Sequence, residues 1–142
     1  MSASFSEKES VYRSDGRSVA VGSNGLVTSA HPWASSAGMK ILKEGGNAFD
    51  AAVATAVALN VVEPYMSGVG GIGLALIYVA KENRVRALNF SGCAPSLAEP
   101  SRFTEHTKEH GILSAMIPGN LAGWHTLHET YGSCDWERLF KS

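Results

Sequence analysis

A run of glycines between Gly68 and Gly73 is the segment whose residue types most directly suggest chemistry. It formally matches the G-x-G-x-x-G pattern, in which a bare backbone approaches a dinucleotide pyrophosphate. That fingerprint requires a strand before the glycines and a helix after them, so that a helix N-terminus faces the phosphates. Here a helical pattern precedes the run and a strand pattern follows it. We therefore favour a close backbone crossing where only glycine fits, and keep a dinucleotide-binding protein as an alternative.

Two histidines, His125 and His128, are three residues apart on an expected helix, a spacing that could direct two imidazoles toward one metal ion. A third ligand is not evident, because Glu129 points to another face and no HExxH motif or cysteine cluster occurs. Surface or half-buried histidines are therefore expected in place of a metal site. No cofactor is expected either.

Nucleophilic catalysis needs a hydroxyl or thiol beside a base or a free α-amine. No G-x-S-x-G elbow occurs, and Ser2, which could become N-terminal after methionine removal, lies in a polar tail without a core to orient it. Arg84 and Arg86 fall on one face of an expected strand, and we expect both to be exposed to solvent. These patterns therefore reveal no activated nucleophile.

The composition excludes several classes of protein. The chain has 142 residues, a formal net charge of −1 and 44% hydrophobic residues, enough for one core of ordinary domain size. Basic and acidic residues are interspersed in nearly equal numbers, so neither a nucleic acid nor a membrane is expected as a partner. The longest apolar run, 51–62, is shorter than the roughly 20 residues that span a bilayer.

The cysteines and the first residues bear on the compartment. Cys93 and Cys134 form no C-x-x-C pair, so both are expected to be free thiols. Residues 1–17 are rich in serine, glutamate and arginine and lack the apolar region of a secretory signal. We therefore expect a cytoplasmic protein in which residues 1–18 form a flexible extension.

The elements that must position these residues follow from periodicity and punctuation. Asn47 is a plausible N-cap for an alanine-rich helix, with Asp50 three residues later, and Pro64 ends that helix. The helix is apolar nearly all round and should therefore be central. The patterns predict helices at 33–44, 48–62 and 120–131, hairpin strands at 72–80 and 84–90, a hairpin or strand-turn-strand around Asn24-Gly25 in 19–27, a weak helix at 101–110 and a short helix starting at 135.

A series of segments resembles the γ-glutamyltranspeptidase family: GLVTS at 25–29, HPWAS at 31–35, GGNAFDAAVA at 45–54, VEP at 62–64, SGVGGIG at 67–73, AP at 94–95, PG at 118–119 and LAG at 121–123. The resemblance covers the chain from about residue 25 to its end, which is more than one short motif supplies. It implies an α+β fold, a partial αββα sandwich of the N-terminal-nucleophile hydrolase type, with residues 19–142 as the N-terminal portion of an incomplete domain. The first two helices would pack on the sheets.

The resemblance also implies a reaction and a partner. Family members cleave themselves and release a threonine whose hydroxyl attacks a γ-glutamyl amide, with its own α-amine as the base. That threonine belongs to a C-terminal segment or subunit, and the Thr-Thr-His processing motif is absent from this chain. We therefore expect an inactive N-terminal fragment of an enzyme that hydrolyses or transfers small amide substrates. The alternative is a non-catalytic remnant or binding module that works through a partner chain.

One position departs from the family pattern. Members carry an Arg-Glu-x-Ala-Pro motif whose arginine pairs with the substrate α-carboxylate, and Ser91 occupies that arginine position in the stretch SGCAP. Replacing a bidentate fork by a hydroxyl costs on the order of 1.5 to 3 kcal/mol of carboxylate binding. Ser91 is thus the expected substrate-binding residue, and glutathione specificity is open. Either the acyl donor differs or another residue binds the carboxylate.

Overall fold

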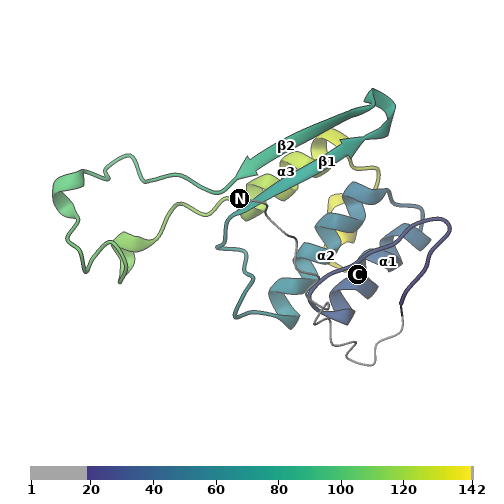
Figure 1. The fold of residues 1–142 in the computed structure, drawn as a ribbon, viewed down its shortest axis with the longest axis horizontal. Helices are drawn as coiled ribbons and strands as arrows, with labels where there is room; N and C mark the ends of the chain where they lie inside the picture. Colours follow the sequence, from purple (N-terminus) through teal and green to yellow (C-terminus); the bar gives the residue numbers. More distant parts are fainter. Residues whose placement is uncertain (1–18, 142) are drawn as a thin grey trace, which may run out of the picture.

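Three α-helices and one antiparallel hairpin form the part of the chain, residues 19–141, that the computed structural model describes (Figure 1). The elements in order are α1 (Pro32–Lys43), α2 (Ala48–Val62), β1 (Gly73–Val79), β2 (Arg84–Phe90) and α3 (Asn120–Tyr131), with short 3₁₀ turns at Ala80–Glu82, Pro100–Arg102, Ile112–Ser114 and Trp136–Phe140. The predicted helices and the hairpin are confirmed to within one residue or so at each end. The expected extension, 1–18, lies outside the described residues.

Local hydrogen bonds explain where the first two helices begin. The His31 ring nitrogen Nδ1 accepts a hydrogen bond from the backbone N–H of Trp33 at 3.2 Å, and Pro32 takes the first helical position. At the start of α2 the Asn47 side chain accepts from the N–H groups of Phe49 and Asp50, while Asp50 accepts from the Asn47 N–H at 2.9 Å. This is a capping box, as the N-cap prediction required.

The hairpin has one packed face and one exposed face. Its register pairs Gly73 with Phe90 and Val79 with Arg84 across the two strands. Because side chains alternate along a strand, Ala75, Ile77 and Val79 turn toward the helices, while Leu74 remains 75% exposed. The outer face consists of Leu74, Leu76, Tyr78, Val85, Ala87 and Asn89.

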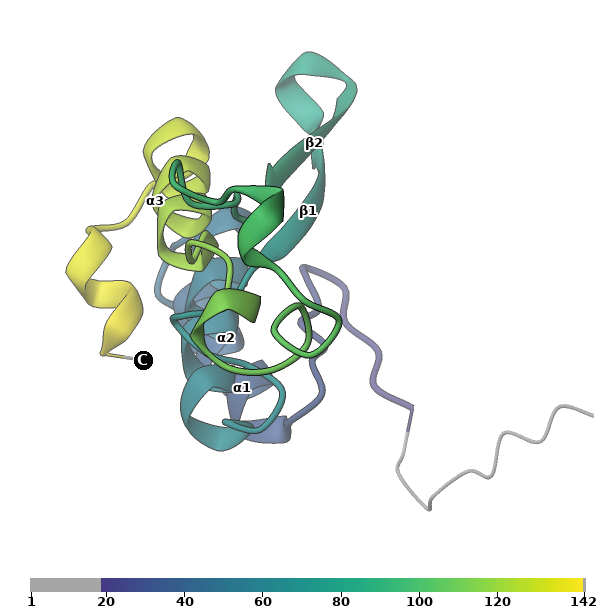
Figure 2. The same cartoon turned by 90° about the vertical axis from the view of Figure 1, so that its left-hand side faces the viewer.

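Helix α2 lies at the centre of the described fold, as predicted, because it contacts α1, α3 and the 3₁₀ turn Trp136–Phe140. Its second half is less covered than expected, and Val61 is 77% exposed. The core is built from residues of all these elements: Ile41, Ala51, Val53, Ala54, Trp124, Leu127 and Leu139. Figures 1 and 2 show α3 alongside the hairpin, whose turn projects beyond the helices. The helix expected at 33–44 is α1. Among the described residues it packs on α2, not on the sheet as expected.

Two local predictions are wrong. Residues 19–27 form no strand, because Val19 and Val21 are about nine-tenths exposed and an isolated ribbon with no face to bury does not hold together. In the 101–110 segment the hydroxyls of Thr104 and Thr107 bond to each other's backbone N–H, which competes with a continuing helix. The short helix expected from Asp135 is confirmed, as a 3₁₀ helix at Trp136–Phe140 with Asp135 at its N-cap.

Candidate functional site

Ser91 lies directly after β2, on the same side of the chain as Asn89. Its backbone N–H donates to the Asn89 side-chain oxygen Oδ1 at 3.0 Å, and its hydroxyl donates to the same oxygen at 2.6 Å. Ser91 is half-buried, whereas Asn89 is exposed at the end of the outer hairpin face. Ser91, the residue expected to bind substrate, is therefore held by its neighbour on the strand.

The end of β2 and the residues after it contact the segment that leads into α3. The N–H of Ile117 donates to the carbonyl oxygen of Cys93 at 3.0 Å. Gly92 has a φ of +81°, and a Cβ there would run into the Ile117 carbonyl oxygen. A Cβ on Gly119 would likewise meet the carbonyl of Phe90. Glycine at both positions lets two backbones touch beside Ser91.

The glycine run makes the close crossing that its composition predicted. The N–H of Gly71 donates to the Gly68 oxygen at 2.9 Å, and the Gly71 oxygen accepts from the N–H groups of Gly119 and Asn120, each at 3.1 Å. The Asn120 side-chain amide donates to the Gly68 oxygen at 2.7 Å. The run follows α2 and precedes β1, so no helix begins after it to face a pyrophosphate. This context does not fit the dinucleotide alternative.

Three segments that are distant in sequence thus meet at one place: 68–73, 89–93 and 117–120. Sequence reasoning assigned Ser91 but missed Asn89 and Asn120 as members of this cluster. Strand alternation could have found Asn89, because it lies two residues before Ser91 and shares its face. Nothing local could have found Asn120, whose side chain reaches across to a residue 52 positions away.

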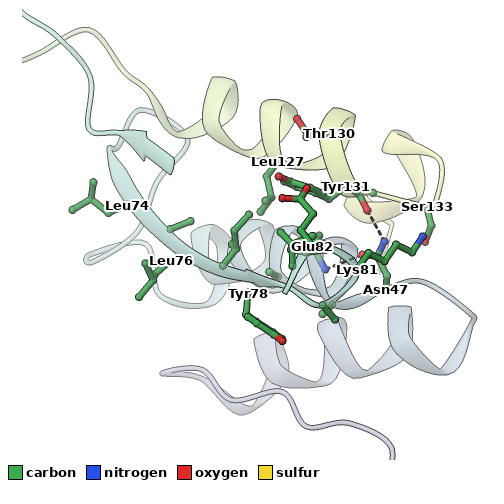
Figure 3. A pocket seen from close by; sticks show the side chains of 18 residues that line it. Asn47, Leu74, Leu76, Tyr78, Lys81, Glu82, Leu127, Thr130, Tyr131 and Ser133 are labelled. Carbon is green, nitrogen blue, oxygen red and sulfur yellow. Dashed lines mark hydrogen bonds between the residues drawn. The ribbon is translucent and has the colours of Figure 1, made fainter. Parts of the chain in front are cut away.

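A groove of about 1180 Å³ lies between β1, the first turn of α2 and the last turn of α3 (Figure 3). Leu127 and Tyr131 of α3 contribute to its wall, and Asn47 and Ser133 contribute polar atoms at one end. Those polar atoms are already engaged, because the Asn47 amide donates to the Tyr131 oxygen at 2.6 Å and the Ser133 hydroxyl donates to Asp50 at 2.6 Å. The Asn47 and Ser133 side chains are therefore occupied by bonds within the fold, and Leu127 adds an apolar part of the wall.

Asp50 is the fully buried charge at this junction of α2 with α3. It accepts from the N–H and hydroxyl of Ser133 and from the N–H of Asn47. Burial opposes ionisation of Asp50, but the hydrogen bonds from Ser133 and Asn47 outweigh it and lower the pKa of the carboxyl group. Burial also raises the pKa of the neighbouring Cys134 thiol, as does the Asp50 charge.

The other residues considered for chemistry lie apart from Ser91. His125 is exposed, whereas His128 is half-buried and donates through Nε2 to the Cys134 oxygen at 2.6 Å. Both rings pack against the ring of Trp136. Arg84 and Arg86 are exposed as predicted, and Arg86 pairs with Glu82. Both cysteines are free thiols, which confirms the prediction.

Within residues 19–141, no three histidine, cysteine, aspartate or glutamate side chains are grouped so as to hold a metal ion. No helix in the same range has the length and apolar character needed to cross a membrane.

Comparisons with known proteins agree on one family. The family model for gamma-glutamyltranspeptidase matches residues 34–142. The chain is 37% identical over 127 residues to glutathione hydrolase proenzyme 1 of Schizosaccharomyces pombe, an alignment that covers 88% of this chain and 20% of that protein. The chain thus spans about a fifth of the length of this curated relative.

Solved structures give the same result for the fold. The Helicobacter pylori gamma-glutamyltranspeptidase superposes with a TM-score of 0.81 at 37% identity, over 87% of this chain and 37% of that chain. A cephalosporin acylase from Bacillus halodurans superposes with a TM-score of 0.76 at 34% identity, over 96% of this chain and 26% of that chain. The described elements are therefore part of the N-terminal-nucleophile hydrolase fold, a partial αββα sandwich, as expected.

Proposed function

Because the chain belongs to the γ-glutamyltranspeptidase family, we propose that it is the N-terminal portion of an amidohydrolase that hydrolyses or transfers γ-glutamyl or related acyl amides. The observation that carries this proposal is the meeting of 68–73, 89–93 and 117–120, which joins three of the family's segments into one backbone framework. The portion described supplies that framework and the substrate-binding position Ser91. It supplies no nucleophile.

The proposed reaction runs through a threonine outside these 142 residues. The threonine hydroxyl oxygen attacks the amide carbonyl carbon, and its proton passes to the threonine α-amine. That proton then goes to the leaving nitrogen as the C–N bond breaks, which leaves an acyl-threonine ester. Water or an acceptor amine attacks the ester and regenerates the threonine. The word proenzyme in the name of the fission yeast relative supports a precursor that is processed before it acts.

The acyl donor need not be glutathione. Ser91 replaces the cationic side chain that would hold an α-carboxylate, and a hydroxyl lacks both the charge and the fork geometry for that task. One structural relative is named a cephalosporin acylase, which supports a family scaffold that accepts different acyl groups. We therefore include acyl amides other than γ-glutamyl compounds in the substrate class.

The test compares the natural gene product containing this chain with the 142 residues alone. The complete product should release p-nitroaniline from an acyl p-nitroanilide and should show an acyl-threonine ester by mass spectrometry, and alanine in place of that threonine should abolish both. The isolated chain should release none. Turnover by the isolated chain, or a complete product with neither turnover nor ester, would contradict the proposal.

A second candidate, a partner-dependent binding module without catalysis, is favoured by one observation. Leu74 and Leu76 on the outer hairpin face are 75% and 79% exposed, which leaves a row of leucines for another surface to cover. A purified chain that is monomeric and unfolds cooperatively would count against an obligate partner. A cytoplasmic location stays a prediction, to be checked by cell fractionation.

A further inference from the structure

We propose that Asn89 and Ser91 together form a neutral donor–acceptor pair that binds a carboxamide or similar uncharged group of the acyl donor in preference to a carboxylate. This inference rests on the proposed function, which places Ser91 against the substrate. It adds Asn89 as a specificity-determining residue and names the chemistry of the group that the pair accepts.

The two hydrogen bonds between Asn89 and Ser91 establish which atom donates and which accepts. The backbone N–H of Ser91 can only donate, so the atom it meets at 3.0 Å must be the Asn89 oxygen, not its nitrogen. That oxygen carries no hydrogen, so the Ser91 hydroxyl, at 2.6 Å, must donate to it. A serine hydroxyl has one proton, and in Ser91 that proton is used in the hydrogen bond to Asn89.

For a ligand, the Ser91 side chain offers only an acceptor and the Asn89 side chain offers only donors. The Ser91 oxygen keeps lone pairs and can only accept, because its single proton is engaged. The Asn89 amide nitrogen is bonded to the same carbon as the engaged oxygen and carries two N–H donors. The pair thus presents an acceptor beside a donor, with no net charge.

A carboxamide matches this arrangement and a carboxylate does not. The carboxamide N–H can donate to the Ser91 oxygen while its carbonyl accepts from the Asn89 amide, and no existing bond is lost. A carboxylate accepts only, so it meets the Ser91 lone pairs unless the hydroxyl turns away from Asn89 and gives up the 2.6 Å bond. The favoured group is therefore neutral and carries its own N–H.

The charged residues of the same strand do not change this preference. Asn89 and Ser91 lie on the outer side of β2, whereas alternation places Arg84 and Arg86 on the other side. Arg86 donates through Nε to Glu82 at 2.8 Å, so its guanidinium is engaged as well. No cation on β2 is positioned to replace the missing arginine.

The test uses two ligands that differ only at this group, glutamate and its α-carboxamide, isoglutamine. Calorimetry on the complete natural gene product should show isoglutamine binding at least fivefold more tightly. Ser91→Arg should reverse the preference by tenfold or more, because a guanidinium fork pairs with a carboxylate. Asn89→Ala should bring the two dissociation constants to within about twofold, because the freed hydroxyl can then donate to either ligand. Ser114→Ala, in the exposed 3₁₀ helix Ile112–Ser114 of the loop between β2 and α3, is the control and should leave the ratio unchanged.

Each outcome separates the two proposals. Tighter binding of isoglutamine without turnover of any acyl amide would retain the binding pair and refute the reaction. Turnover with tighter binding of glutamate would refute the pair alone. An unchanged ratio in Asn89→Ala, or no binding of either ligand at millimolar concentration, would also overturn the inference.

Discussion

At the residue scale, Asp50 connects the start of α2 with the end of α3. Its carboxylate accepts bonds from Asn47 three residues before it and from Ser133 83 residues after it, so one side chain serves both the helix cap and the tertiary contact. A buried charge is stable only when it is fully paired, and here hydrogen-bond donors supply the pairing. Asp50 therefore fixes how the two helices meet.

Replacement of this residue should be costly. Asp50→Asn keeps the shape but puts an N–H₂ group where Asn47 and Ser133 present donors, so at least one buried N–H loses its acceptor. We expect a loss of about 3 kcal/mol in the free energy of unfolding, measured by urea denaturation. Asp135→Asn is the matched control, because Asp135 is exposed and makes no capping bond, and it should change stability by less than about 0.5 kcal/mol. Equal losses in both variants would contradict this role.

The same carboxyl group should make stability depend on acid pH. The pKa of Asp50 is lowered from its ordinary value of 3.8, so the stabilisation is fully present above pH 3.8 and is lost as the pH falls through the lower folded value. The stability difference between wild type and Asp50→Asn, followed by thermal unfolding from pH 7 to pH 2, should therefore be constant down to about pH 4 and then shrink. A difference that stays constant to pH 2 would refute the assignment.

At the element scale, the glycine run, the end of β2 and the start of α3 hold one another through backbone contacts. Gly71 lies where the turn at 68–71 meets Asn120, and a Cβ there would be 2.7 Å from the Asn120 amide nitrogen and 2.9 Å from the Gly68 oxygen. A Cβ on the neighbouring Gly70 would meet no atom within 4 Å. Two adjacent glycines thus have different structural roles.

This contrast yields a matched pair of variants. Gly71→Ala should lower the free energy of unfolding by about 2 kcal/mol, because the methyl group displaces the Asn120 side chain from its part-buried hydrogen bond to the Gly68 oxygen. Gly70→Ala should change it by less than about 1 kcal/mol in either direction. Both are measured by the denaturation midpoint at constant m-value. If the Gly70 variant proved the less stable of the two, the proposed crossing would be wrong.

The outcome for individual elements shows what local patterns can predict. The range 48–62 has both a capping box at one end and proline after the other, and its helix was predicted with the correct bounds. The 19–27 segment has the turn residues of a hairpin, yet whether two strands pair depends on a surface that buries one face. That surface is a tertiary property. The Thr104 and Thr107 bonds that stop the 101–110 helix likewise compete with a pattern that looks helical.

At the scale of the whole molecule, the described residues bury one side of the hairpin and leave the other apolar side open. Leu74, Leu76 and Tyr78 are all more than half exposed, and their cross-strand neighbours Val85 and Ala87 are exposed as well. A continuous apolar face of this kind on a short sheet favours association with another surface. We infer that the chain by itself is prone to self-association.

Substitution on this face should reduce that association. The double variant Leu74→Lys and Leu76→Lys should shift the isolated chain from larger species toward the monomer mass in light scattering, with little loss of helical circular dichroism, because neither side chain is in the core. Leu97→Lys is the control, since Leu97 is 73% exposed but lies away from the hairpin. The outer face is not the associating surface if the control variant shifts the mass equally.

The family, the helices and the hairpin can be predicted from residue patterns alone, because periodicity, capping residues and motifs act over short distances. The packing of α1 on α2, the bond from Asn120 to the glycine turn and the bonds from Ser133 to Asp50 arise only in the folded chain. Such features depend on which backbone atoms meet after the chain has folded, and no residue pattern encodes a distance between segments far apart in sequence.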